Sequence, residues 1–377
     1  MKTWISLNMT PGIGPRKATQ LLERFGSADN VFHALRSELE GLRLKAETIQ
    51  SILKKEFHDK AEEELNNVKE MGGDVLVLDD GSYPNLLREI ADPPITLYVK
   101  GNWQECFEMP CIGIVGSRRC TTYGRNASEM LGRDLAEHGV CVVSGFARGI
   151  DSQAHKGAIE GKGKTIAVFG TGIDGVYPKE NAKLVDEILD SGGAIVSQFP
   201  LGTPPLRENF PYRNRIISGL SYGILIIEAS ERSGSLITAR LAMEQDREVM
   251  AIPGNITSKT SFGTNYLIKS GAKLVQQWQD VVSEFPAEIA AEILPPKVDE
   301  EDKKDKKAEK PTSNFPKGLS INEKKIYENL KADAHKHLDL IMDESGLSFG
   351  ELNSAIVSLD LKDLILVLPG NNYARKI

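Results

Sequence analysis

Hydrophobic side chains in the first seventy residues recur every three or four positions. Ala18, Leu21, Leu22 and Phe25 follow this spacing, and apolar residues repeat it between 46 and 68. The spacing places apolar side chains on one face of a helix and polar side chains on the other. We therefore predict a small helical domain over residues 1–72.

The pattern changes after residue 72 to short, nearly continuous apolar runs separated by helical segments. Strands of this kind, joined by helices, are typical of a parallel sheet that is covered on both faces. We predict an α/β domain over residues 73–290, Rossmann-like, with a doubly wound, mostly parallel sheet. Only Gly81–Gly101, which contains Tyr-Pro and Pro-Pro pairs, is expected to be irregular. The predicted strands are Val75–Leu78, Cys111–Val115, Val140–Val143, Thr165–Phe169, Ala194–Ser197, Tyr222–Glu228, Glu248–Ile252 and Lys273–Val275.

Two further segments follow the α/β region. Residues 291–316 are rich in acids and lysines and have no apolar period, so we expect a charged, flexible linker. Residues 317–377 show helical spacing near Glu323–Lys331, His337–Ser345 and Phe349–Leu361, followed by a hairpin. Three helices and a hairpin predict a winged-helix-like domain.

The third helix of this tail is acidic. It carries Glu351 and Asp360, with Asp363 just beyond its end, against Lys362 alone. A helix that reads the major groove is expected to be basic. We therefore expect the tail to contact protein rather than duplex DNA.

A turn near the start of the chain is one possible site of DNA contact. The segment Pro11-Gly-Ile-Gly-Pro-Arg-Lys-Ala18 places a glycine hairpin before a helix. It resembles a single helix-hairpin-helix element, which grips a DNA backbone through its amides. An ordinary connection between two helices would contain the same residues, so both interpretations stay open.

Composition restricts the class of protein. The chain has 377 residues, enough for two or three domains, and a net charge of −7. It has no apolar run of the roughly 20 residues that span a bilayer, and its start lacks a signal-peptide core. Cys106, Cys111, Cys120 and Cys141 form no CxxC pair, which argues against a zinc site or disulfide framework and favours a reducing cytoplasm. Because the net charge is negative, any nucleic-acid site must be a local cationic patch.

The segment Phe210-Pro-Tyr-Arg-Asn-Arg-Ile-Ile-Ser-Gly-Leu220 is the strongest candidate site. Arg213, Asn214 and Arg215 stand between an aromatic–proline turn and an apolar helix. Their donors and the helix dipole would converge on a phosphate. The aromatic residues offer flat faces to an unpaired base. A salt-bridged helix cap would account for the same residues.

Small polar residues and arginine also follow other predicted strands. Glycine turns expose amide groups, and serine and arginine add a hydroxyl and a fixed charge. Because parallel strands end at one edge of a sheet, these residues are expected to line one cationic crevice. They are Gly116, Ser117 and Arg118 after one strand, Gly145 after the next, and Ser233, Gly234 and Ser235 at the start of a later helix.

Asp151 and His155 are four residues apart and therefore share a helix face. A metal site or an acid–base pair is conceivable, but a metal needs a third ligand, and none is placed nearby in the sequence. The alternative is that Asp151 caps the helix and His155 is hydrogen-bonded within the turn. No Ser/His/Asp or Cys/His set and no paired carboxylates are found. We predict binding, with no catalytic residue, metal or cofactor.

Together these motifs are similar to those of the DNA-processing protein A (DprA/Smf) family. The helical head and the winged-helix tail also resemble accessory modules of that family. The matching segments cover the α/β region in order. They are GSR at 116–118, SGFARGIDSQAH at 144–155, YP at 177–178, FPYRNRIISGL at 210–220, EASERSGSLITA at 228–239 and AIPGN at 251–255.

The resemblance implies a cytoplasmic homodimer whose Rossmann-like domain binds single-stranded DNA without sequence preference. It further implies protection of incoming DNA and help in loading the RecA recombinase during natural transformation or recombination, with no membrane partner. Leu220–Leu225 and the Ile268 region are the candidate dimer surfaces. By motif, Ser117 and Arg118 would hold a phosphate, Phe210 would face a base, and Lys179, Arg207, Arg213 and Arg215 would extend the channel.

One position departs from the expected family pattern. Gln198 stands where a glutamate is expected, which leaves the role of that carboxylate open. The alternative function is that of a nucleotide-hydrolysing Rossmann enzyme of the lysine-decarboxylase-like (LOG) group. Those enzymes have a PGGxGT turn and a catalytic Arg/Glu pair, whereas the corresponding segments here read ERSGSLIT and AIPGN.

Overall fold

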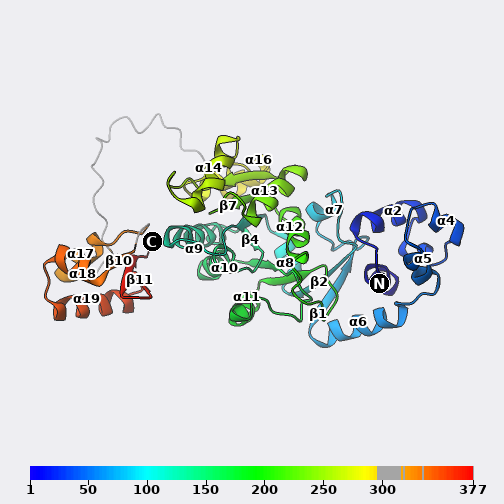
Figure 1. Cartoon of the computed structure of the whole chain (residues 1–377), viewed down its shortest axis with the longest axis horizontal. Helices are drawn as coiled ribbons and strands as arrows, with labels where there is room; N and C mark the ends of the chain where they lie inside the picture. The colour runs from blue at the N-terminus through cyan, green and yellow to red at the C-terminus, as the bar shows by residue number, and fades with distance from the viewer. Residues whose placement is uncertain (295–315, 317–318, 333–334, 377) are drawn as a thin grey trace.

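Six helices form the N-terminal part of the computed structural model, which describes residues 1–294, 316, 319–332 and 335–376 (Figure 1). Before the second helix, Gly12 turns the chain with a φ of +82°. Pro15 then begins that helix, at a position where a missing amide costs no hydrogen bond. The helices are α1 (Lys2–Met9), α2 (Pro15–Phe25), α3 (Ala28–Val31), α4 (Arg36–Glu40), α5 (Ala46–Leu53) and α6 (His58–Glu70).

These helices pack directly onto the α/β region. Ile5 and Val68 belong to the same buried cluster as Tyr98 of the sheet. The amide of Leu201 donates to the carboxylate of Glu64 at 2.6 Å. The boundary near residue 72 is therefore a change of secondary structure, across which the hydrophobic core continues.

A nine-stranded sheet occupies the centre of the chain. Its order is β1-β2-β6-β5-β4-β3-β7-β8-β9, and all pairs from β6 to β9 are parallel. The predicted Rossmann-like, mostly parallel sheet is thus confirmed. The strands are β1 (Gly73–Val77), β2 (Thr96–Gly101), β3 (Cys111–Val115), β4 (Cys141–Ser144), β5 (Thr165–Val168), β6 (Ala194–Ser197), β7 (Gly223–Ile226), β8 (Glu248–Ala251) and β9 (Lys273–Leu274).

The expectation that Gly81–Gly101 is irregular throughout was wrong. Its last six residues form β2, which pairs antiparallel with β1 and with β6. Leu97, Tyr98 and Val99 are fully buried there. A run of β-branched and aromatic residues favours a strand, and the proline-containing turns lie before it.

Helices cover both faces of the sheet (Figure 1). Successive residues of β7 alternate between two hydrophobic clusters, since Ile224 and Ile226 belong to one and Leu225 to the other. The first cluster is completed by α8 (Trp103–Glu108), α12 (Asn209–Gly219), α13 (Gly234–Glu244) and α14 (Phe262–Lys269), and the second by α9 (Thr122–Glu137), α10 (Ile150–Glu160), α15 (Trp278–Val282) and α16 (Ala287–Ile293). None of the described helices is long and apolar enough to cross a bilayer.

The strand order reverses between β3 and β7. From β3 the chain continues to β4 on one side, and β7 lies on the other side. In open parallel sheets, ligands bind outside the carboxyl ends of the strands at such a switch point. The loops that follow β3 and β7 therefore mark the expected site.

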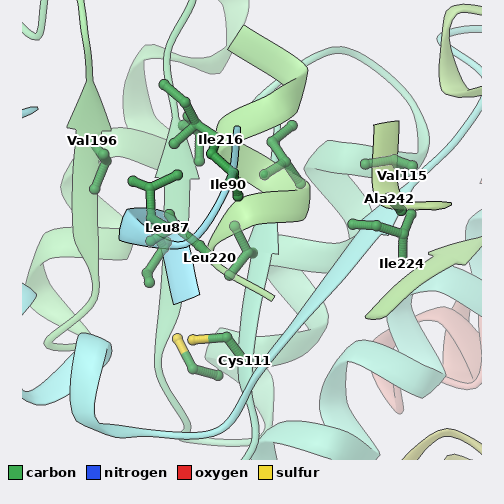
Figure 2. Close-up of a cluster of buried hydrophobic side chains, with 14 of the residues drawn as sticks. Leu87, Ile90, Cys111, Val115, Val196, Ile216, Leu220, Ile224 and Ala242 are labelled. Atoms are coloured by element: carbon green, nitrogen blue, oxygen red, sulfur yellow. The ribbon is translucent and has the colours of Figure 1, made fainter. Parts of the chain in front are cut away.

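Helix α12 is held against the sheet by its apolar face. Figure 2 shows Ile216 of α12 and Leu220, which directly follows that helix, beside Leu87 of α7 (Asn85–Arg88) and the nearby Ile90. Gly219 permits this approach, because a Cβ there would lie 2.6 Å from a methyl carbon of Leu87. This packing fixes where the other faces of α12 point.

The C-terminal residues form the predicted winged helix. Three helices and a three-stranded sheet enclose a hydrophobic cluster of their own. Asn126 of α9 joins this domain to the α/β region by donating to the carbonyls of Ala332 (2.9 Å) and Arg375 (3.3 Å). The elements are α17 (Ile321–Asn329), β10 (Lys336–His337), α18 (Leu338–Ser345), α19 (Phe349–Leu361), β11 (Ile365–Leu368) and β12 (Asn372–Arg375).

The prediction placed residues 291–293 in the linker, but they belong to a helix of the α/β region. Helix α16 continues to Ile293 because Ile289 and Ile293 pack against the core of the α/β region. Apart from 291–294 and Pro316, the predicted linker lies outside the described residues.

Buried Glu323 ties α17 to α19 within the winged helix. Its carboxylate accepts hydrogen bonds from Lys362 Nζ (2.7 Å) and Ser358 Oγ (2.5 Å), and from the amide of Ser320 (2.5 Å). These donors, led by Lys362, hold the pKa of Glu323 down to about 2. The carboxylate is therefore charged in the folded domain at any pH above that value.

We predict that Glu323→Gln destabilises the C-terminal domain by roughly 1–3 kcal/mol at neutral pH, because charge-assisted hydrogen bonds are lost. The folded pKa of Glu323 lies below its ordinary value of 4.5, so this stabilisation is complete above about pH 4.5 and is lost as the pH falls toward 2. Hydrogen exchange of α19 amides at pH 7 and pH 3 measures it. Glu328→Gln, an exposed position on the same helix, is the control. A deficit that is equal at both pH values would contradict the prediction.

Candidate nucleic-acid interface

A cleft of about 770 Å³ lies where β3 and β7 end, at the switch point of the sheet. Its charged lining consists of Arg118, Arg207, Arg213 and Arg232 against one carboxylate, Asp151. The cleft is therefore cationic although the chain as a whole is acidic. The predicted residues that line it are Gly116, Ser117, Arg118, Arg207, Phe210, Arg213, Asn214, Ser233, Gly234 and Ser235.

The loop after β3 is shaped by its contact with Gly149. Gly149 has a φ of +76°, and a Cβ there would collide with the backbone of Ser117 and Arg118. The amide of Ile150 donates to the carbonyl of Ser117 at 3.2 Å. Only glycine allows so close an approach, so Gly149 fixes the path of the loop that carries Arg118 after β3.

Arg118 and two aromatic rings form one wall of the cleft. The Arg118 guanidinium carbon lies 5.3 Å from the centre of the Phe210 ring, within the range of a cation–π contact. The rings of Phe210 and Tyr177 are 5.6 Å apart and tilted by 45°. Arg118 itself is exposed. Positive charge beside flat apolar faces suits a phosphate and its attached base.

Arg213 lines the cleft, but its side chain is buried. Its guanidinium donates to the carbonyls of Gly145 and Val168, at the ends of β4 and β5. Burial lowers the pKa of Arg213 to about 10, so the side chain stays charged at neutral pH. A Cβ at Gly145 would lie 2.8 Å from this guanidinium, which accounts for the glycine. Arg213 thus supports the floor of the cleft.

Asp151 lies opposite Arg213. Burial raises the pKa of its carboxyl group, and the Arg213 charge and the amide of Ala147, which donates to it at 3.3 Å, act in the opposite direction. Its hydrogen bond goes to the loop preceding α10, so the residue holds that loop. The capping interpretation was wrong, because Gly149 is the N-cap of α10 and no side chain caps that helix end.

His155 is a buried structural histidine. Thr165 Oγ1 donates to the carbonyl of Val142 (2.6 Å), so the 2.7 Å contact from His155 Nδ1 is a donation to that hydroxyl oxygen. The partner is therefore on β5, and the predicted bond within the turn was wrong. Burial lowers the pKa of His155 to about 3, so the ring is neutral. Among the described residues, no group of three or more His, Cys, Asp or Glu side chains is placed to hold a metal.

Arg215 does not line the cleft. Helix α12 begins at Asn209, earlier than the sequence suggested, so Arg213 and Arg215 lie inside the helix and point to different sides. The Arg215 guanidinium donates to the carbonyl of Asp92 (2.7 Å) and to Gln198 Oε1. The amide oxygen of Gln198 is thus the internal acceptor where a glutamate was expected.

The remaining predicted residues differ in position. Ser233 caps α13, and its hydroxyl lies 2.8 Å from that of Ser235. Gly145 lines a small adjoining pocket together with Arg118, Tyr177 and Phe210. Lys179 is exposed, in the short helix η1 (Lys179–Asn181), and is not among the residues that line either hollow.

Sequence reasoning missed Arg232. It is exposed and lines the cleft next to Ser233, which was predicted. Arg232 lies in the loop between β7 and α13, directly before Ser233, and this position could have identified it from the sequence. Arg148 borders the adjoining pocket, where its Nη2 is 2.6 Å from Glu180 Oε2.

Comparison with known proteins assigns the family. A family model described as DNA recombination-mediator protein A matches residues 74–286, and one described as the DprA winged helix domain matches residues 309–371. Protein Smf of Escherichia coli K12 is 36% identical over 301 residues, which cover 79% of this chain and 76% of the relative. DNA processing protein DprA of Streptococcus pneumoniae R6 is 47% identical over 209 residues, or 55% of this chain and 73% of the relative.

Solved structures agree. The X-ray structure of DprA from Streptococcus pneumoniae aligns with a TM-score of 0.67 and 36% identity, covering 76% of this chain and 98% of the other. A structure of DNA processing protein A from Helicobacter pylori, described for its single-stranded DNA binding mode, aligns with a TM-score of 0.51 and 29% identity, covering 56% of this chain and 97% of the other. The first family model alone spans more than half of the sequence, and this chain therefore belongs to the DprA/Smf family of DNA-processing proteins.

Proposed function

We propose that the cleft at the switch point binds single-stranded DNA without regard to sequence. The observation that carries this proposal is the contact of Arg118 with the Phe210 ring at the wall of a cleft that four arginines line. Guanidinium groups bind phosphates, and ring faces stack with any base. The Helicobacter pylori relative, described for its single-stranded DNA binding mode, supports the same ligand.

A role in binding rather than hydrolysis fits the chemistry of the cleft. Asp151 is the one carboxylate among the residues that line it. Burial raises the pKa of this group, and it is engaged by the amide of Ala147 and faces Arg213. A general base needs access to its substrate, whereas this carboxylate is buried and accepts a hydrogen bond from the protein backbone. We therefore favour a DNA-binding protein over a LOG-type nucleotide hydrolase.

The wider role that we propose follows from the family. The cleft would protect incoming single strands in the cytoplasm and present them to the RecA recombinase during transformation or recombination. An exposed arginine–aromatic wall leaves the base edges unread, which suits a protein that must accept any sequence.

We further propose that the chain forms a homodimer through helix α14 and its surroundings. The Leu220–Leu225 candidate was wrong, because Leu220, Ile224 and Leu225 are buried in the core of the domain. Ile268, in contrast, is partly exposed on α14. The exposed apolar side chains of this region are Met243 (56%), Phe262 (54%), Tyr266 (60%) and Leu274 (40%).

We predict that Arg118→Ala weakens binding of labelled oligo-dT by about 1–3 kcal/mol, because a phosphate contact and its cation–π support are lost. The dependence of log affinity on log salt should become shallower by about one unit. Fluorescence anisotropy at two salt concentrations measures both, and the oligonucleotide should be recovered intact. Affinity equal to that of the wild type would exclude the cleft wall as the site.

Two variants serve as controls for Arg118. Arg36→Ala removes an exposed arginine from the N-terminal helices and should leave binding unchanged. Arg215→Ala should instead lower the free energy of unfolding by about 2–4 kcal/mol, since it unpairs buried partners. Weaker DNA binding by Arg215→Ala with unchanged stability would show that Arg215 contacts the strand directly.

We predict that the chain stimulates the ATPase of RecA on single-stranded DNA that is already coated with single-strand-binding protein. The Arg118→Ala variant should stimulate it less, because presentation requires the strand to be held in the cleft. Initial rates of ATP hydrolysis measure the effect. Stimulation that is the same without DNA, or that is unaffected by Arg118→Ala, would show that the effect on RecA does not depend on the cleft.

We predict that Tyr266→Asp converts the dimer to a monomer, because a charge is buried without a partner at the centre of an apolar contact. Light scattering after gel filtration measures the mass. Leu35→Asp, which places a charge at an exposed apolar position on the N-terminal helices, is the matched control. A wild-type chain that is monomeric at all concentrations would overturn the dimer proposal.

A further inference from the structure

The start of α13 lies on the cleft and offers several hydrogen-bond donors to a ligand. Ser233, Gly234, Ser235 and Thr238 all line the cleft there, together with Arg232. The first amides of an α-helix have no acceptor within the helix, and the helix dipole favours a negative charge beside them. A Cβ at Gly234 would meet no atom within 4 Å, so the space beside the first turn is open to a ligand.

The hydroxyl of Thr238 is an independent feature of the same place. Thr238 is only 1% exposed, and its Oγ1 has no hydrogen-bond partner among the residues that the structure describes. Side chains of a helix point back toward its N-terminus, so Thr238, four residues after Gly234, lies over the first turn. A buried hydroxyl without a partner is unfavourable, and an oxygen of a ligand in the cleft would supply the missing acceptor.

The two serine hydroxyls provide a further donor. Ser233 Oγ accepts a hydrogen bond from the amide of Ser235 at 3.4 Å, and the two hydroxyl oxygens are 2.8 Å apart. One hydroxyl proton is used between these oxygens, and the other can be donated to a ligand. The first turn of α13 thus combines hydroxyl and amide donors within one short segment.

The charge around this turn suits an anion. Arg232 is exposed directly before the turn, and Arg118 lines the same cleft. Glu231 is exposed as well, but it is not among the residues that line the cleft, where Asp151 is the one carboxylate. Asp151 lies near the buried Arg213, so its negative charge is met within the protein.

We propose that the start of α13 binds the terminal phosphate of a DNA single strand. This inference rests on the proposed binding of single-stranded DNA in the cleft, and it adds a preference for a strand end. A phosphate within a strand has two ester bonds and two free oxygens, and it needs room for a nucleotide on either side. A terminal phosphate has three free oxygens and nearly two negative charges at neutral pH. It therefore makes better use of the clustered donors, and it reaches a buried hydroxyl such as that of Thr238 more easily.

The test uses the full chain and short, unlabelled oligo-dT strands that compete with labelled oligo-dT for binding. One strand has a 5′-phosphate, one has a 3′-phosphate, and one has hydroxyl groups at both ends. We expect a phosphorylated strand to bind about tenfold more tightly than the unphosphorylated strand, because a dianion accepts charge-assisted hydrogen bonds. Fluorescence anisotropy measures the affinities, and the two phosphorylated strands identify which end is bound.

Equal affinity of all three strands would overturn this proposal. Arg118→Ala shows whether the cleft itself is then still the binding site. If that variant weakens binding of every strand, the proposed function stands and only the preference for a strand end fails. If it weakens binding of none, the proposed function fails as well.

Two substitutions at Thr238 separate its hydroxyl from general attraction of charge. Thr238→Val keeps the shape and removes the donor, so it should remove most of the preference for the phosphorylated strand, whereas Thr238→Ser keeps the hydroxyl and should keep the preference. Thr264→Val makes the same change at a buried position of α14 that is not among the residues lining the cleft, and it should also keep the preference. A preference that Thr238→Val leaves unchanged, or that Thr264→Val removes equally, would overturn the proposal.

Discussion

The buried guanidinium of Arg213 is the interaction on which the candidate site depends. It connects α12 to the carbonyl groups at the ends of β4 and β5, and it faces Asp151 of α10. Without it, two buried carbonyls would lose this donor, at a cost of about 1–3 kcal/mol for each unpaired group, and Asp151 would lose the nearby positive charge. A side chain at Gly145 would displace it. The exposed Arg118 and the half-buried Phe210 are thus supported by elements that one buried charge connects.

Much of this frame could be predicted because it follows from local patterns. Apolar runs identified the parallel strands, and the rule that such strands end at one edge placed Ser117, Phe210 and Ser233 in one cleft. The roles of Arg213 and Arg215 could not be predicted in the same way. Pro211 suggested a turn, yet proline is tolerated in the first turn of a helix, and α12 already begins at Asn209. Residues two apart in a helix point about 200° apart, so these arginines meet different partners, which only the tertiary structure supplies.

The electrostatics of the chain separate two surfaces. The cleft gathers four arginines around one carboxylate, while α18 and α19 carry acids along their exposed faces. On a protein of net charge −7, a polyanion is repelled from most of the surface and attracted only where positive charge is concentrated. Repulsion elsewhere therefore adds to any preference of a polyanion for the cleft.

Helix α9 connects these two surfaces mechanically. At its N-terminus, Thr121 donates through its amide (2.9 Å) and its hydroxyl (2.5 Å) to buried Glu228 at the end of β7, beside the cleft. Little more than one turn later, Asn126 holds the carbonyls of Ala332 and Arg375 in the winged helix. A ligand held at the winged helix would therefore lie near a strand bound in the cleft, and a ligand held in this way acts at a raised effective concentration.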